Sequence, residues 1–156
     1  MRIGQGIDVH RVSDDPARVL WLGLVHVPDA PGLVGHSDAD VATHALCDAL
    51  LGAAGLGDLG RHFPDSDPAF AGVPSRRLLE TVVERVGAAG FSVDSGDVTI
   101  VAERPTLAPY LTAMSHELST VVGAPISVKA TTAEGLGALG RVEGIAASAV
   151  VLVSPS

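Results

Sequence analysis

The sequence carries three metal-binding side chains in two short segments: Asp8 and His10 in Asp8-Val-His10, and His44 at the end of His36-Ser-Asp-Ala-Asp-Val-Ala-Thr-His44. One carboxylate and two imidazoles suit Zn²⁺, and three protein ligands leave the fourth tetrahedral position open to a substrate oxygen. An open position is typical of catalytic zinc sites, whereas the protein fills all four positions in structural ones. The residue types therefore predict a catalytic metal centre.

A strand and a helix must bring these ligands together. Side chains alternate between the two faces of a strand, so Asp8 and His10 share one face of a strand predicted over 2–12, together with Gly4 and Gly6, which are expected to leave room beside the ligands. The opposite face of that strand then carries Ile3, Ile7 and Val9.

The third ligand, His44, falls about one turn inside a predicted helix. We expect Ser37 or Asp38 to cap this helix, which runs to about Ala54. Asp40 precedes His44 by four residues, so it can lie beside His44 on the helix surface. We therefore expect Asp40 to accept the second ring proton of His44.

The rest of the sequence alternates between strands and helices. Strands are predicted over 19–27, 91–102, 126–130 and 145–153, with a turn at 29–32, a helix that Ser75 caps and that Gly87 and Gly90 end, and a helix over 109–122. The strands 2–12 and 19–27 are expected to pair as a hairpin with a long loop. This order predicts one domain over 1–156 of the α/β type, an α+β sandwich with helices on one face of a mixed β-sheet. Because the other face needs a cover, we expect oligomerisation through the sheet.

Composition narrows the possible partners. The chain has 156 residues, 47% of them hydrophobic, which is enough for a sizeable core, and a net charge of -8. That charge argues against a nucleic-acid partner, because phosphate backbones are met by clustered Lys and Arg. With only 10 basic residues, a phosphate site must rely on metal ions and backbone amides. Cys47 is a lone cysteine expected in the core, and the absence of a long apolar run predicts a cytoplasmic protein that does not enter membranes.

Two glycine-rich segments leave their roles open. The segment 57–68 is too rich in Gly, Pro and Asp for a regular element; it could bind sugar hydroxyls through its carboxylates or be a solvated connection. In the segment 129–144, Lys129, Arg141 and two Thr hydroxyls could address phosphate oxygens, and Glu134 could hold a divalent cation. A flexible hairpin connection would have the same composition.

Taken together, these residues resemble the family of 2-C-methyl-D-erythritol 2,4-cyclodiphosphate synthases, of the non-mevalonate route to isoprenoids. The matching blocks occur in the family's order and spacing: Asp8-Val-His10, His36-Ser-Asp-Ala-Asp-Val-Ala-Thr-His44-Ala-Leu, Gly57-Asp-Leu-Gly60, Phe63-Pro-Asp65, Val98-Thr-Ile-Val-Ala102, and Lys129-Ala-Thr-Thr132 through Gly140-Arg-Val-Glu-Gly144. The resemblance covers essentially the whole chain, and the Ser-Asp-x-Asp-x-x-x-His run is highly specific.

The resemblance implies a homotrimer with three active sites at the subunit interfaces, each with Zn²⁺ on Asp8, His10 and His44. It implies a second cation, Mg²⁺ or Mn²⁺, held by Glu134 and bridging the α- and β-phosphates of the substrate. That substrate would be 4-diphosphocytidyl-2-C-methyl-D-erythritol 2-phosphate, a small-molecule cytidine diphosphate. Its 2-phosphate would attack the β-phosphorus and expel CMP, which makes the protein a lyase of isoprene biosynthesis.

The resemblance also assigns roles residue by residue. His36 and Thr132 match the positions that stabilise the transition state, and Ser37 lies beside the 2-phosphate. Asp58 matches the residue that holds the erythritol hydroxyls, and this end of the substrate is closed by Leu59, Gly60, Phe63, Pro64, Asp65, Ser66 and Asp67. The cytidine pocket is lined by Ala102, Glu103, Arg104, Pro105, Thr106, Leu107, Ala108 and Thr131. Further ligand contacts fall on Val9, Ala133, Ala138 and Arg141.

The chain departs from the family pattern at two informative positions. Thr106 stands where many members have Lys, so one phosphate contact is missing or passes to Arg104. Ile7 replaces an aromatic residue beside the central cavity of some members, which affects the isoprenoid-diphosphate binding implied there. Two other functions are compatible with the same residues: a zinc-dependent hydrolase that uses metal-bound hydroxide, and a non-catalytic nucleotide-binding oligomer with a structural metal.

Overall fold

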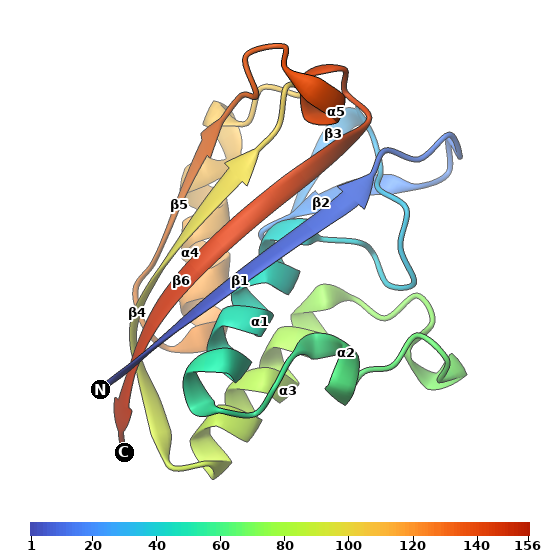
Figure 1. Cartoon of the computed structure of the whole chain (residues 1–156). Coiled ribbons are helices and arrows are strands. Elements are labelled where there is room, and N and C mark those ends of the chain that lie inside the picture. The colour runs from blue at the N-terminus through green and yellow to red at the C-terminus, as the bar shows by residue number, and fades with distance from the viewer.

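A four-stranded mixed sheet forms the framework of the protein, as seen in a computed structural model that describes all 156 residues (Figure 1). Its strands follow the order β1 (Arg2–Arg11), β6 (Gly144–Pro155), β4 (Phe91–Val101) and β5 (Ile126–Thr131). Strand β6 runs antiparallel to both of its neighbours, and β5 is parallel to β4. The predicted α+β fold with a mixed sheet is thereby confirmed.

Three helices cover one face of this sheet: α1 (Val41–Ala54), α3 (Ser75–Ala88) and α4 (Leu111–Val122) (Figure 1). The short elements are α2 (Leu59–His62), α5 (Gly137–Gly140) and the 3₁₀ turns η1 (Pro68–Phe70) and η2 (Ala108–Tyr110). A single cluster of 33 buried apolar residues lies between helices and sheet, and it includes Cys47 as expected. No helix is both long and apolar enough to cross a membrane, and the cytoplasmic location stays a prediction.

Helix α1 lies directly on strand β1 because two glycines of the strand have no side chain. A Cβ on Gly4 would fall 2.0 Å from the carbonyl oxygen of Ala49, and one on Gly6 would fall 2.1 Å from that of Ala45. The sequence had suggested that these glycines leave room beside the metal ligands. Instead they let the helix backbone approach the strand backbone, and this approach sets the distance from His44 to Asp8 and His10.

The other face of the sheet is open in the single chain and carries apolar side chains on β1. The exposed fractions are 69% for Ile3, 61% for Ile7 and 59% for Val9. Large contiguous apolar surfaces of this kind are uncommon on monomeric proteins. The predicted alternation of the strand is confirmed, since Gly4 and Gly6 are buried on the helix side.

The pairing of the second strand was predicted wrongly. Instead of one strand that pairs with β1, the segment forms a tight hairpin of β2 (Val19–Leu22) and β3 (Val25–Pro31), and β1 pairs only with β6. The expected turn at 29–32 largely belongs to β3. The actual turn is Gly23-Leu24, with φ of 56° and 66°. A leucine at positive φ gives no turn signal in a sequence, because two-residue hairpin turns normally use Asn or Gly there.

Both predicted helix caps were also wrong, and the segment 57–68, expected to be irregular, contains the short helix α2. Asp40, rather than Ser37 or Asp38, is the N-cap of α1 and accepts a hydrogen bond from Thr43 N at 3.0 Å. Ser75 is the first residue of α3 and does not cap it.

Candidate metal centre and adjoining pocket

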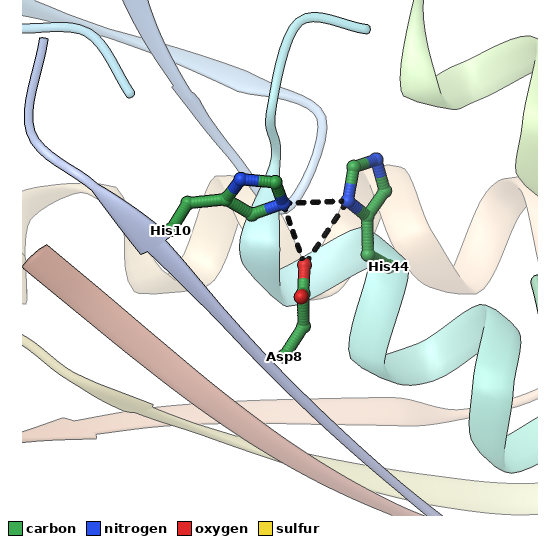
Figure 2. A group of neighbouring side chains, drawn as sticks. All are labelled: Asp8, His10 and His44. Carbon is green, nitrogen blue, oxygen red and sulfur yellow. Dashed lines mark hydrogen bonds and ion pairs between the residues drawn. The ribbon is translucent and has the colours of Figure 1, made fainter. Parts of the chain in front are cut away.

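Asp8, His10 and His44 converge on one point, as Figure 2 shows. Asp8 Oδ2 lies 2.9 Å from His10 Nε2 and 3.1 Å from His44 Nδ1, and the two ring nitrogens are 3.3 Å apart. Metal–ligand bonds of about 2.0–2.1 Å in a tetrahedral site place ligand atoms ~3.3 Å from one another. The spacing of the three atoms therefore suits a small divalent cation.

Hydrogen bonds on the far sides of the rings direct lone pairs to that point. His10 Nδ1–H donates to the carbonyl oxygen of Val34 at 2.7 Å, which leaves Nε2 without a proton in the neutral ring. Ser75 Oγ–H donates to the Asp38 carboxylate, so Ser75 Oγ accepts a hydrogen bond from His44 Nε2–H, 2.9 Å away. The Nδ1 atom of His44 then carries no proton and has a free lone pair. In these tautomers three electron-pair donors face one another, an arrangement that a cation among them would stabilise.

The electrostatics of the cluster agree with this view. Burial by itself raises the pKa of Asp8, but the hydrogen bonds and charges of His10 and His44 outweigh it and hold the pKa well below its usual range. Burial lowers the pKa of His10, whereas the hydrogen bond and the charge of Asp8 raise it more, so the net shift is upward. Both shifts favour a carboxylate with positive charge beside it, whether that charge is a proton or a metal ion.

The expected bond between Asp40 and His44 does not exist. The carboxylate of Asp40 is fully buried and accepts from the backbone N–H groups of Gly23 and Leu24, both at 2.8 Å, as well as from Thr43. It fixes the β2–β3 turn against the start of α1. Ser75, which sequence reasoning assigned to a cap, takes the place next to His44.

A pocket of about 310 Å³ adjoins the metal ligands. Six other predicted site residues line it: His36, Ser37, Leu59, Gly60, Phe63 and Asp65. Asp58 is exposed and caps α2 through Arg61 N, and Pro64, Ser66 and Asp67 do not line the pocket. The structure thus brings the candidate metal ligands, the His36-Ser37 pair and four residues of the 57–68 segment to one cavity.

The residues expected around cytidine form a second group. Glu103, Arg104, Pro105 and Thr106 line a separate hollow of about 570 Å³ at the end of β4. Glu103 Oε2 accepts from Ala133 N at 3.1 Å and Gly135 N at 3.4 Å, which joins this segment to the loop after β5. Between the end of β5 and the start of β6, Thr131, Thr132, Glu134, Ala138 and Arg141 are exposed, and none of them lines the 310 Å³ pocket.

The sequence did not indicate the roles of three residues that support the candidate metal site: Ser75, Asp48 and Arg18. Asp48 lies one turn after His44 on α1, lines the pocket, and accepts from Leu59 N at 2.7 Å. Its position four residues after a ligand is a signal that periodicity could have used. Arg18 donates to main-chain carbonyl oxygens, so the types of its partner residues give no sign of the contact in the sequence.

An α+β fold with one helix-borne and two strand-borne ligands beside a pocket defines a protein with a candidate metal centre. The chain belongs to the YgbB family, whose profile matches residues 1–154. It is 52% identical to the 2-C-methyl-D-erythritol 2,4-cyclodiphosphate synthase of Trichlorobacter lovleyi, over 99% of each chain.

Solved structures show the same fold. The bifunctional IspDF of Campylobacter jejuni superimposes with a TM-score of 0.94 at 38% identity, over 99% of this chain and 42% of the longer one. The CDP complex of IspF from Plasmodium falciparum superimposes with a TM-score of 0.85 at 30% identity, over 99% and 96%. The resemblance inferred from the sequence is confirmed.

Proposed function

We propose that this chain converts 4-diphosphocytidyl-2-C-methyl-D-erythritol 2-phosphate to 2-C-methyl-D-erythritol 2,4-cyclodiphosphate and CMP. An oxygen of the 2-phosphate attacks the β-phosphorus, the bond from the β-phosphorus to the oxygen bridging the two phosphates breaks, and CMP leaves with that oxygen. The reaction is intramolecular, so it requires positioning and charge neutralisation rather than a protein nucleophile.

The observation that carries this proposal is the convergence of Asp8 Oδ2, His10 Nε2 and His44 Nδ1 at the wall of the pocket that also holds His36 and Ser37. Their separations of 2.9–3.3 Å and the hydrogen bonds behind both rings fit Zn²⁺. When bound, Zn²⁺ supplies Lewis-acid polarisation of a phosphate and neutralises its charge. The three side chains hold and orient that cation.

The other pocket residues bind and align the substrate. His36 is exposed at the mouth, and with Thr132 it stabilises the charge of the transition state. Ser37 addresses the 2-phosphate, and Asp58, with Leu59, Gly60 and the Phe63–Asp67 segment, holds the erythritol end. The loops Ala102–Ala108 and Thr131–Ala133 bind the cytidine diphosphate, and Glu134 holds Mg²⁺ or Mn²⁺ on it.

A homotrimer reconciles the two groups of residues. Within one chain the cytidine segments line a different hollow from the metal pocket, so the site is completed by the corresponding loops of a neighbouring subunit. The open face of the sheet, with Ile3, Ile7 and Val9, is the surface through which subunits associate. The single buried core supports treating 1–156 as one functional domain.

Phosphorus NMR of the purified protein with the cytidyl substrate, Zn²⁺ and Mg²⁺ tests the function, with an EDTA-treated sample as control. We expect a cyclic diphosphate and CMP, both lost on chelation. A linear hydrolysis product would identify a zinc hydrolase instead, and unchanged substrate would leave a binding role.

A further inference from the structure

Arg18 lies just before β2 and is half-buried. Its guanidinium donates twice: Nε–H to the carbonyl oxygen of Leu33 at 2.6 Å, and Nη2–H to that of Ser37 at 2.9 Å. Its own carbonyl oxygen accepts from Gly32 N at 3.1 Å, so the residue is attached to both the start and the end of the loop that leads to α1.

The loop between those two carbonyls carries groups that act on the metal centre. Val34 offers the carbonyl oxygen that accepts the Nδ1 proton of His10 at 2.7 Å. Ser37 Oγ lies 3.2 Å from His44 Nε2. His36 projects from the same loop into the mouth of the pocket.

Leu33 anchors the start of this loop through its buried side chain and a β-bridge to Val12, but few contacts hold residues 34–37. Backbone bonds join Val34 N to Arg11 O at 2.7 Å and Gly72 N to His36 O at 2.7 Å. Apart from His10 itself, Arg18 is the one side chain that bonds to carbonyl oxygens of residues 33–37. Residues 35–38 are bends and lie in no helix or strand, so the backbone ladder of a regular element does not fix their conformation.

We infer that Arg18 is a positioning residue for the metal centre: its two-pronged guanidinium fixes the Leu33-to-Ser37 segment and thereby aims the Val34 carbonyl at His10 and the Ser37 hydroxyl at His44. The inference rests on the proposed metal role of Asp8, His10 and His44. A lysine cannot make the same two hydrogen bonds in this geometry. Its ammonium group is a single donor centre on a flexible side chain and lacks the planar pair of N–H groups of a guanidinium.

A positioning role and a purely electrostatic role of Arg18 predict different Zn²⁺ affinities for its variants. If Arg18 acted only as a positive charge near the ligands, Arg18→Lys would leave metal affinity unchanged and Arg18→Gln would raise it, since a repelling cation is removed. If it positions the loop, both substitutions weaken metal binding. Loss of the hydrogen-bonding partners behind metal ligands typically costs 10–100-fold in affinity.

The experiment is competition of the metal-free proteins with a chromophoric chelator for Zn²⁺, without substrate. We expect Arg18→Lys and Arg18→Gln to bind Zn²⁺ about 10–100-fold more weakly than the parent protein. The matched control, Arg77→Lys, alters an arginine on α3 whose side chain is 76% exposed, and should bind Zn²⁺ like the parent. At saturating Zn²⁺, kcat of the Arg18 variants should stay below that of the parent, because His36 and Ser37 remain displaced.

Parent-like Zn²⁺ affinity in folded Arg18→Lys, or tighter binding by Arg18→Gln, would overturn the inference. Circular dichroism of each apo variant establishes folding, and Arg18→Lys carries the test if Arg18→Gln does not fold. Because Zn²⁺ affinity is measured without turnover, a parent protein that fails to convert the cytidyl substrate would refute the proposed reaction and leave this measurement valid.

Discussion

The hydroxyl of Ser75 bridges His44 and Asp38: its oxygen lies 2.9 Å from His44 Nε2 and donates its proton to the Asp38 carboxylate. Ser75 is fully buried, and its backbone N–H also donates to Asp38, at 2.9 Å. The first turn of α3 is thereby tied to the loop before α1 and to a metal ligand. This chain of carboxylate, hydroxyl and imidazole fixes both the tautomer and the direction of the His44 ring.

Replacing Ser75 by Ala should weaken Zn²⁺ binding about 10-fold or more, because His44 loses the nearer of its two acceptors and keeps only Ser37 Oγ at 3.2 Å. The free energy of unfolding should fall by about 1–3 kcal/mol, since buried polar groups lose a partner. Isothermal titration of Zn²⁺ and urea unfolding measure the two effects. Ser115→Ala is the matched control: it removes a hydroxyl that donates to Ile126 O at 2.6 Å, away from the site, and should change stability but not metal affinity.

Asp48→Asn should stabilise the metal-free protein at neutral pH. Burial of the carboxyl, with the nearby charges of Asp58 and Asp8, raises the pKa of Asp48 against the opposing hydrogen bond from Leu59 N. A raised folded pKa means a contribution to stability that is fully present below the unfolded pKa and lost as pH rises through the folded pKa. The amide keeps the oxygen that accepts from Leu59 and carries no charge.

Urea unfolding at several pH values measures this difference. The Asp48→Asn variant should be more stable than wild type at pH 7, and the gap should close below about pH 4, where the unfolded wild-type carboxyl is also protonated. A variant that is less stable than wild type at pH 7 would show that the carboxylate charge itself holds the Leu59 segment.

His44→Ala should abolish turnover and leave the fold intact. The substitution removes one of three ligands, so kcat should fall by more than the roughly 100-fold that loss of a supporting hydrogen bond can cost. Chelation of the wild-type protein should likewise give an inactive protein with unchanged circular dichroism. His116→Ala, on the exposed face of α4, is the control and should remain active. Unfolding on chelation would instead assign the metal a structural role.

Ile7→Asp should disrupt the proposed trimer. Each subunit that buries Ile7 gains about 1.5–3 kcal/mol, and a carboxylate in its place would have to be desolvated. Light scattering should then report a lower mass than for wild type. Val19→Asp is the control, because Val19 is 50% exposed but belongs to the separate β2–β3 sheet. A wild-type protein that is monomeric at micromolar concentration would contradict assembly through the sheet.

Thr106→Lys should lower KM for the cytidyl substrate with little change in kcat. Thr106 is exposed beside Arg104 and Pro105 in the hollow assigned to cytidine diphosphate, and an ammonium there would add a charge-assisted contact to phosphate. Steady-state kinetics of the parent protein and the variant measure both KM and kcat. An unchanged KM would mean that Arg104 already makes the contact or that position 106 does not face the phosphates.

The candidate metal ligands could be proposed from the sequence because residue type and local periodicity indicate them, and the structure brings all three together. Asp8 and His10 share a strand face by alternation, and His44 lies on a helix whose hydrophobic content is plain. The partners behind them were not predictable, because Ser75 reaches His44 only through the packing of α3 on α1. Arg18 was missed for another reason: its acceptors are carbonyl oxygens, which every residue possesses.

Asp40 accepts hydrogen bonds from buried backbone N–H groups whose need for an acceptor cannot be seen in the sequence. Its spacing from His44 favoured a role beside the metal. The backbone N–H groups of Gly23 and Leu24, however, are buried in the turn and need hydrogen-bond acceptors. The two carboxylate oxygens of Asp40 are those acceptors. The cost of leaving buried amides unpaired outweighs a hydrogen bond to an imidazole that can find Ser75 instead.

The contact of α1 with β1 at Gly4 and Gly6 should make the geometry of the candidate metal centre insensitive to side-chain substitutions elsewhere in the core. The span between His44 and the Asp8-His10 pair is set by main-chain atoms in contact, so exchanging one aliphatic side chain for another in the core alters volumes without changing that span. Conservative core substitutions should therefore leave the geometry of the three candidate ligands unchanged, whereas any side chain at Gly4 or Gly6 would force α1 away from β1.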